Sequence, residues 1–336
     1  MVDQCTDNGR FARGFRSAVG TDIGHRRAVN EDSYLAEFPV FVVADGMGGH
    51  RGGEVASAIA VQSLQPLVGR SDVTPQEVAT LLGIAQQRVS AFSDTVQGGS
   101  GTTLSGVVVV RGNAHAPDPY PEGSPAHAPA GGSVCGNEPL QWLVLNIGDS
   151  RTYRIRGGQA LQLTVDHSEV QELIDSRTIP RDITTREKGV VLRERNVLTR
   201  ALGDGSSVTD LWTMPIVAGD RMLVVSDGAF ADVSEADFLR VAAHPRFNTQ
   251  SASDSVWRVI EQALNAGGTD NVTVVVVEVP TWVMARRISS GQPASVIQGR
   301  TDRVFPPLAS LTREPPSDTT APSSRNVRNR RQSRSQ

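Results

Sequence analysis

Several stretches of the chain consist of unbroken β-branched or aliphatic residues bounded by Gly, Asp or Arg, a pattern typical of buried β-strands. The predicted strands are residues 40–44, 104–110, 142–147, 152–155 and 272–279. Residues 151–163 also predict a hairpin, because Gly157-Gly158 lies between two strand-like segments. The pattern therefore indicates a domain built mainly on β-sheet.

Other stretches place apolar residues at helical spacing, which predicts amphipathic helices at residues 53–67, 75–94 and 252–265. The second has a complete start signal, with Thr74 as N-cap, Pro75 in the first turn and Glu77 three residues after the cap. A short helix is expected around residues 172–174, ended by Pro180. Strands and helices in this mixture favour two stacked sheets covered by layers of helices.

Composition separates one folded domain from segments of different character. Residues 15–280 hold all the predicted elements, and the whole chain is 38% hydrophobic and 21% charged, as is ordinary for a globular protein. Residues 1–14 are expected to be a flexible N-terminal segment. Residues 112–138, rich in Pro, Gly, Ala and His, predict a mobile surface insert. Residues 281–336, rich in Ser, Pro, Arg and Gln, predict a disordered tail.

The net charge of −3 is unevenly distributed along the chain. Residues 281–336 contain ten arginines and three acids, a balance of +7, so the preceding residues carry −10. An acidic domain argues against binding to nucleic acid. Two isolated cysteines, the lack of an apolar signal segment and the lack of a run of about 18 apolar residues favour a cytoplasmic protein without a transmembrane helix.

Acidic residues recur where the apolar runs stop, and this is the main chemical signal in the sequence. Apolar runs end at Asp45, Asp149 and Asp227, another begins after Asp270, and residues 30–32 add an acidic pair. Each acid is expected to follow or precede a strand in a turn. Acids at the ends of buried strands repel one another and lose solvation. Hard divalent cations such as Mg²⁺ or Mn²⁺ relieve both costs, so the pattern predicts a metal site.

These acids belong to short motifs that follow one another in a recognisable order. The motifs are Arg27-x-x-Asn30-Glu31-Asp32, Asp45-Gly-Met-Gly-Gly-His50, Ser100-Gly-Thr-Thr103, Asn146-x-Gly-Asp-Ser-Arg151 with Tyr153 and Arg156, Leu163-Thr-x-Asp166-His167-Ser168, Arg195-Asn-Val-Leu-Thr-Arg-Ala-Leu-Gly203, Ser226-Asp-Gly228 and Asp270-Asn271. One such motif is weak, since Asp-Gly is a common turn pair, but the ordered set is specific. Over residues 17–279 the chain resembles the metal-dependent Ser/Thr protein phosphatases of the PPM (type 2C) family, in its bacterial branch.

The resemblance implies an α+β fold, a four-layer α-β-β-α sandwich with two central, mainly antiparallel β-sheets flanked by helices. It also implies two core Mn²⁺ or Mg²⁺ ions at one end of the sandwich, between the sheets, and a third, weaker site. The roles it carries over are Asp45 as bridging ligand, the Gly46 carbonyl on the second ion, Asp227 and Asp270 on the first, Glu31 on the second, and Asp32 on metal-bound water. Asp149 matches the acid of the third site, and a structural hydrogen-bonding role for it stays open.

Three further points follow from the matched motifs. Arg27 is expected to hold the substrate phosphate in its guanidinium fork, and an ordinary surface salt bridge is the alternative. Met47 occupies the position where eukaryotic members carry a His proposed as general acid, and Met has no proton to donate. The group that protonates the leaving oxygen therefore stays open. Residues 168–196 match a flap beside the active site, with a plain surface connection as the alternative.

The activity implied is hydrolysis of phosphoserine and phosphothreonine on proteins, by attack of a water that bridges the metals. The expected partners are phosphorylated proteins, Ser/Thr kinases among them, and the expected state is a monomer. One alternative is a phosphatase dedicated to a single regulatory phosphoprotein in a partner-switching pathway. Another is a metal-free pseudophosphatase that acts as a scaffold, but an acid is present at every matched position.

Overall fold

The computed structural model describes residues 14–48, 52–112, 140–177, 197–205, 207–243 and 252–279. These residues belong to one compact unit within residues 1–300. The predicted tail, almost all of the predicted insert and residues 1–13 lie outside the described residues. The expectations for those segments, and the domain boundaries drawn from them, stay predictions.

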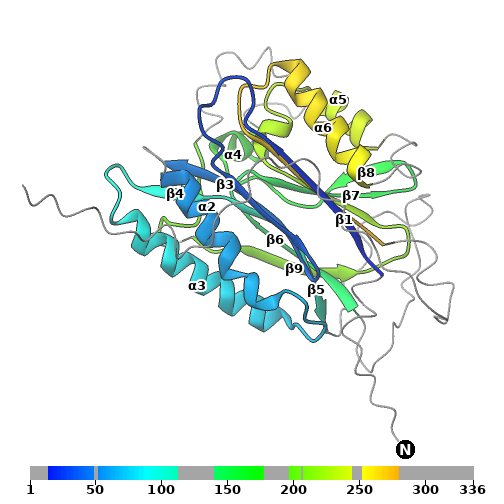
Figure 1. Cartoon of the computed structure of the whole chain (residues 1–336), viewed down its shortest axis with the longest axis horizontal. Helices are drawn as coiled ribbons and strands as arrows, with labels where there is room; N and C mark the ends of the chain where they lie inside the picture. The colour runs from blue at the N-terminus through cyan, green and yellow to red at the C-terminus, as the bar shows by residue number, and fades with distance from the viewer. Residues whose placement is uncertain are drawn as a thin grey trace, which may run out of the picture. The chain divides into compact units, whose positions relative to one another are not determined.

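Two β-sheets with antiparallel strand pairing form the centre of the fold (Figure 1). One five-stranded sheet has the order β1 (Arg16–Asp22), β11 (Val272–Glu278), β10 (Arg221–Val225), β7 (Arg151–Arg156) and β8 (Gln159–Gln162). The six-stranded sheet has the order β2 (Asp32–Glu37), β3 (Val40–Gly48), β5 (Leu104–Arg111), β6 (Leu140–Ile147) and β9 (Asp210–Pro215), and β4 (Ser100–Thr102) pairs with β3.

Helices cover the outer faces of both sheets, as Figure 1 shows. Helices α2 (Gly52–Ser63) and α3 (Pro75–Ser93) lie over the six-stranded sheet, and α5 (Glu235–Ala242) and α6 (Ala252–Ala266) lie over the five-stranded one. The remaining helical segments are α4 (Glu169–Asp175) and the 3-10 turns η1 (Gln65–Leu67) and η4 (Asp227–Ala229). The four-layer α-β-β-α sandwich predicted from the sequence is confirmed.

Apolar side chains fill all three interfaces between the layers. One cluster joins α2 and α3 to the six-stranded sheet, and a second joins α5 and α6 to the five-stranded sheet. The third lies between the sheets and contains Phe41, Trp142 and Met222, each at most 1% exposed. Burying one large apolar side chain contributes about 1.5–3 kcal/mol, so these interfaces hold the sheets rigidly enough to position side chains at their ends.

The predicted helices are present with small shifts at their ends. Helix α3 has the predicted capping box, in which Thr74 and Glu77 each accept a backbone N–H of the other. The helix predicted at residues 53–67 ends at Ser63, and a 3-10 turn containing Pro66 follows it. A proline inside a helix removes a hydrogen bond and clashes with the preceding turn. The short helix around residues 172–174 is α4.

Some elements were not predicted from the sequence, and one strand is longer than predicted. Strands β1, β2 and β9 and helix α5 did not stand out in the sequence, because their apolar residues are few or interrupted by polar ones. Asp45 was predicted to end its strand, and this is wrong. Strand β3 continues to Gly48, because β4 pairs with its second half, with Gly46 opposite Thr102.

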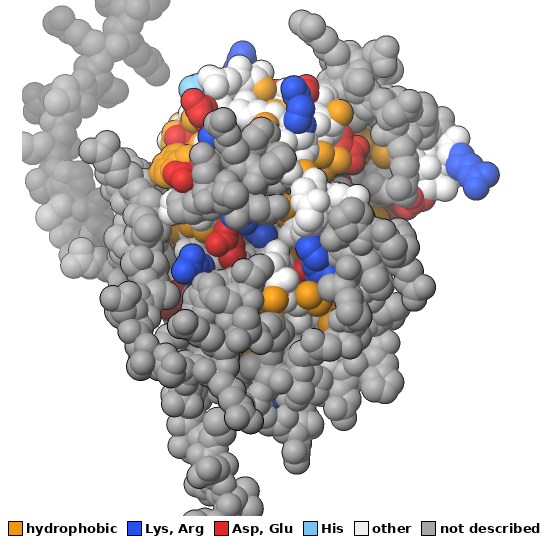
Figure 2. Space-filling model, turned by 90° about the vertical axis from the view of Figure 1, so that its right-hand side faces the viewer, with side chains coloured by type: hydrophobic (Ala, Val, Ile, Leu, Met, Phe, Trp, Pro, Cys, Tyr) orange, Lys and Arg blue, Asp and Glu red, His pale blue; other side chains and the backbone are white. Residues whose placement is uncertain are grey.

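Figure 2 shows one face of the molecule, part of which consists of described residues. On the face in Figure 2, acidic and basic side chains lie interspersed among apolar and neutral ones. Among the residues that the structure describes, no helix combines the length and the apolar character needed to cross a membrane.

Candidate metal centre

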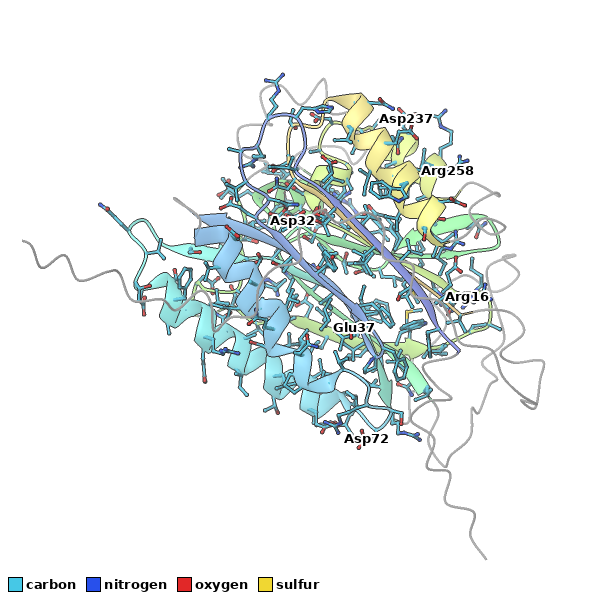
Figure 3. All side chains as sticks on the ribbon, viewed as in Figure 1. Arg16, Asp32, Glu37, Asp72, Asp237 and Arg258 are labelled. Carbon is cyan, nitrogen blue, oxygen red and sulfur yellow. The ribbon has the colours of Figure 1, made fainter. Side chains whose placement is uncertain are left out.

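The sheets bring the predicted acids to one end of the sandwich. Asp32 begins β2 and lies directly opposite Asp45 in β3. Asp227 follows β10, Asp149 lies in the turn between β6 and β7, and Asp270 precedes β11. Figure 3 shows Asp32 and Glu37 at opposite ends of β2, so the site lies at the Asp32 end. Residues from five separate segments thus converge because neighbouring antiparallel strands start and stop there.

Asp45 and Asp227 are in direct side-chain contact. Burial raises the pKa of Asp45 well above its ordinary range, and the neighbouring carboxyl groups of Asp32, Asp227 and Asp149 raise it further. A hydrogen bond between the Asp45 and Asp227 side chains acts in the same direction. Two carboxyl groups in contact cannot both stay ionised unless a cation lies between them; without one, the pair holds a proton.

Asp32 is the most deeply buried acid of the group, at 3% exposure. Its Oδ2 accepts a hydrogen bond of 2.8 Å from the Ser226 hydroxyl, which in turn accepts from the Thr273 backbone N–H. Its Oδ1 is buried with no hydrogen-bond partner among the described residues. Burial raises the pKa of Asp32 to about 7, and the nearby charges of Asp227 and Asp270 add to the shift.

Gly46 allows two other parts of the site to approach the chain closely. A Cβ at this position would lie 2.1 Å from the Gly53 carbonyl oxygen and 2.6 Å from that of Glu31, distances that no side chain tolerates. The first turn of α2 and the segment carrying Glu31 therefore pack directly on the backbone beside Asp45. Burial raises the pKa of Glu31, whereas Arg27 lowers it.

Hydroxyl groups of the Ser100–Thr103 motif hold Asp45 by its backbone. The Asp45 N–H donates to the Thr103 Oγ1 at 2.9 Å, and the Asp45 carbonyl accepts from the Thr103 N–H and the Thr102 hydroxyl, each at 2.9 Å. The Thr103 hydroxyl also bonds to Ser150 Oγ at 2.7 Å. Ser150 belongs to the turn of Asp149, so this pair of hydroxyls joins the two acidic segments across the sandwich.

The side chain of Asn271 holds the backbone of the segment before β2 in place. Its Nδ2 donates to the carbonyls of Ile23 and Val29, each at 3.0 Å, and its Oδ1 accepts the Glu31 N–H at 2.9 Å. Both ends of the loop that carries Arg27 are thereby fixed to the residue that follows Asp270. The side chain of Asn271 is 4% exposed, so these bonds are shielded from water.

Arg27 points at the acids and remains half exposed. Its Nη2 donates to Asp270 Oδ2 at 2.6 Å, with the Arg27 side chain 48% exposed and that of Asp270 25% exposed. The sequence left two roles open for Arg27, binding of the substrate phosphate and a surface salt bridge. The structure has a salt bridge, and its partner is Asp270 of the acid cluster. A guanidinium group in this position is able to keep one N–H on Asp270 and offer others to a bound anion.

The donor chemistry of this site fits hard divalent cations. The Asp45 and Asp227 side chains are in contact, the buried Oδ1 of Asp32 has no hydrogen-bond partner among the described residues, and burial raises the pKa of Asp32, Asp45 and Asp149. In the part of the chain that the structure describes, however, no three Asp, Glu, His or Cys side chains already form a closed group around one point. Asp270 in particular is engaged by Arg27.

Comparison with known proteins decides the family. Residues 19–265, well over half of the chain, match the family model described as protein phosphatase 2C. The chain belongs to the protein phosphatase 2C family.

Bacterial members of the family resemble the chain along most of its length. The Ser/Thr protein phosphatase PstP of Mycobacterium tuberculosis is 33% identical over 79% of this chain, and the chain spans 45% of the length of that relative. The Ser/Thr phosphatase stp of Listeria innocua is 32% identical over 77% of this chain and 93% of its own. A similar solved structure is the crystal structure of the PstP catalytic domain in complex with two manganese ions. The match covers 79% of this chain and 98% of the PstP chain, with 30% sequence identity and a TM-score of 0.61.

Some residues that hold this protein phosphatase 2C site together were not assigned a role from the sequence. All four of Thr103, Ser150, Asn271 and His167 lie in recognised motifs. Ser150, Asn271 and His167 each directly follow an acid, which is the signal that could have marked them, whereas Thr103 has no acid beside it in the sequence. Asp210, which bonds to His167, gives no local signal. It is the first residue of β9, and the site includes it only because β9 pairs with β6.

Proposed function

We propose that this protein is a metal-dependent protein Ser/Thr phosphatase that hydrolyses phosphoserine and phosphothreonine on proteins. One observation carries the proposal: Asp32, Asp45, Asp149 and Asp227 act on one another electrostatically at a single end of the sandwich, with Arg27 beside them. The family to which the chain belongs and the two manganese ions in the similar PstP catalytic domain support it.

The residues that would hold two core Mn²⁺ or Mg²⁺ ions are Asp45 as bridge, the Gly46 carbonyl, Asp227, Asp270 and Glu31, with Asp149 for a third ion. When bound, such ions neutralise phosphoryl oxygens and activate a water. The chain's own contribution is to keep these donors aligned through Thr103 and Asn271, whose hydrogen bonds fix the backbone on either side of the cluster. Asp32 would orient a water through its buried Oδ1, which has no hydrogen-bond partner among the described residues.

Arg27 would bind the substrate phosphate at the exposed rim. Its half-exposed guanidinium is accessible to a phosphorylated side chain, and its contact with Asp270 aims it at the acids. A planar donor fork binds two phosphate oxygens at once, which places the phosphorus relative to the site. The balance of −10 carried by residues 1–280 favours a protein substrate over a nucleic acid.

The test is turnover of phosphoserine and phosphothreonine peptides by the full chain. We expect hydrolysis that requires added Mn²⁺ or Mg²⁺ and stops in excess chelator, with Asp227→Asn as the control for contaminating phosphatases. Undiminished hydrolysis in chelator, or equal activity of Asp227→Asn, would contradict the proposal.

Three further expectations belong to the proposal. The partners are phosphoproteins, including a Ser/Thr kinase, the chain is a monomer, and it works in the cytoplasm. Light scattering of the purified protein tests whether the chain is a monomer, and cell fractionation tests the location. A kinase whose phosphorylation rises when the chain is deleted would be the expected partner. The retained acid at every matched position argues against a non-catalytic scaffold.

A further inference from the structure

The turn between β6 and β7 leaves backbone groups that the sheets do not bind. Strand β6 ends at Ile147 and β7 begins at Arg151, and between them Gly148 has a φ of +95°. Buried backbone N–H and C=O groups need partners, and outside a strand those partners must be supplied from elsewhere. A Cβ at Gly148 would lie 2.5 Å from Thr103 Cγ2, so glycine is needed here both for its φ and for its size.

His167 supplies partners for both polar groups of Gly148. The Gly148 N–H donates to His167 Nδ1 at 3.2 Å, and the Gly148 carbonyl accepts the His167 N–H at 2.9 Å. The Asn146 Nδ2 adds a longer bond of 3.3 Å to the same carbonyl. One residue, 3% exposed, thus holds the start of the turn from two directions.

These contacts determine the tautomer of the His167 ring. Because Nδ1 accepts a hydrogen bond, the ring proton lies on Nε2, which is 3.0 Å from Asp210 Oδ2. The other Asp210 oxygen accepts from Arg200 Nη1 at 2.8 Å. Burial lowers the pKa of His167, which keeps Nδ1 unprotonated. A chain of hydrogen bonds thus runs from the Asp210 carboxylate through the His167 ring to the backbone N–H of Gly148.

The rest of the turn is anchored as well. Ser150 bonds to Thr103 at 2.7 Å, and the Arg151 guanidinium forms a fork with Asp166, with Nη2 at 2.6 Å from Oδ2. Asp149 lies between these anchors, and its carboxyl group interacts electrostatically with Asp227 and Asp166. The consecutive residues Asp166 and His167 therefore hold the two ends of a turn whose second residue carries the acid.

We propose that His167, oriented by Asp210, is a positioning residue that fixes Gly148 and thereby places the Asp149 carboxylate at the acid cluster. The inference rests on the proposed function, because it assigns Asp149 a part in the reaction. In the simpler account, His167 is only a buried residue of the core. The positioning role makes one further requirement, that His167 affect the reaction through Asp149.

Two substitutions separate the contacts of the ring. In His167→Asn, the side-chain oxygen takes the place of Nδ1 and still accepts the Gly148 N–H, while the bond to Asp210 is lost. In His167→Gln, the amide reaches toward Asp210, while the acceptor for Gly148 is lost. Residues that orient metal ligands typically contribute about 10–100-fold to activity. We expect His167→Gln to lose kcat in that range, and His167→Asn to lose clearly less.

A double-mutant cycle with Asp149→Asn tests whether His167 acts through Asp149. If it does, the double variant His167→Gln/Asp149→Asn has the same kcat as Asp149→Asn alone. Multiplying losses, or an Asp149→Asn variant with wild-type kcat, would overturn the inference. Val259→Ala, a core change in α6 away from the site, is the control for destabilisation alone and should leave kcat unchanged.

Readouts that need no turnover separate this inference from the proposed function. The ¹⁵N spectrum of His167 should show Nδ1 unprotonated and Nε2 protonated, and Gly148 should exchange its amide hydrogen faster in His167→Gln than in His167→Asn. In calorimetry with Mn²⁺, His167→Gln and Asp149→Asn should lose the same part of the binding. If the wild type hydrolyses no phosphopeptide, the proposed function fails, and matched Mn²⁺ losses would still support the inference. Unmatched losses, or an Nδ1-protonated ring, would overturn it.

Discussion

A buried aspartate lies near each end of strand β10, Asp220 at one end and Asp32 of β2 at the other, and the two ends differ in what balances the charge. Asp220, just before the strand, accepts hydrogen bonds from the Nε atoms of Arg154 at 2.9 Å and Arg156 at 2.8 Å. Beyond the other end, the Ser226 hydroxyl bonds to Asp32, and the charged neighbours that act on the Asp32 carboxyl group are Asp227 and Asp270.

Burial raises the pKa of both aspartates from 3.8 to about 7, but the neighbours act in opposite directions. Arg156 lowers the pKa of Asp220, whereas the acids around Asp32 raise its pKa further. The first arrangement is complete in itself and serves the fold. The second gathers negative charge that only a cation or bound protons can balance, which is why we place the function there.

The largest expected effect is the loss of activity in Asp45→Asn. The amide keeps the size of the side chain but removes the charge that bridges the proposed ions, a loss of several kcal/mol in transition-state stabilisation, or about a thousandfold in kcat. Circular dichroism should show an intact fold. Asp72→Asn, on an exposed acid, is the matched control with unchanged turnover. Comparable kcat values for the two variants would show that the Asp45 carboxylate takes no part in the reaction.

At the opposite end, Asp220→Ala should act on stability and not on chemistry. It leaves two buried guanidinium groups without their carboxylate, and breaking a buried ion pair in this way costs about 3 kcal/mol or more. Urea denaturation measures the loss, and kcat of the folded fraction should match the wild type. An unchanged denaturation midpoint would show that the fold does not depend on this pair.

The two ends also differ in how pH and metal act on stability. Because the folded pKa of Asp32 is about 7 and its ordinary value is 3.8, the folded protein keeps a proton that the unfolded chain has released. Stability of the metal-free protein should therefore fall as pH rises from about 4 to about 7. Asp32→Asn should reduce this slope. Urea denaturation of chelated protein at several pH values checks this; an unaltered slope in Asp32→Asn would count against it.

Arg27→Lys should give the smallest change. Lysine keeps the charge but loses the planar fork, so about one charge-assisted hydrogen bond to the phosphate is lost, worth about 1.5 kcal/mol or roughly tenfold in KM. The affinity for Mn²⁺ should stay as in the wild type, because lysine keeps the positive charge beside Asp270. Steady-state kinetics that match the wild type would reduce the Arg27–Asp270 bond to a surface salt bridge.

The same comparison shows how much the sequence reveals. The acids of the functional end interrupt apolar runs, so Asp45, Asp149 and Asp227 were predicted to gather, and the start of helix α3 was readable from Thr74, Pro75 and Glu77. Strand β2 was not predicted, since residues 32–37 mix acids with apolar residues. Its pairing with β3 is nevertheless what sets Asp32 opposite Asp45.

Partners that depend on pairing between distant segments left no local trace. Asp210 reaches His167 only because β9 lies beside β6, and Asp220 reaches Arg154 only because β10 lies beside β7. The continuation of β3 past Asp45 was missed for the same reason, because it depends on β4. Periodicity reports which face of an element is buried; it does not report which elements become neighbours.

Calorimetric titration of metal-free protein with Mn²⁺ tests the central claim, that the end of the sandwich rich in acids is built for divalent cations. The account predicts at least two Mn²⁺ ions per chain for the wild type and for Asp220→Asn, and a clear loss of affinity in Asp45→Asn. Equal Mn²⁺ binding by the wild type and Asp45→Asn, or none by the wild type, would contradict it.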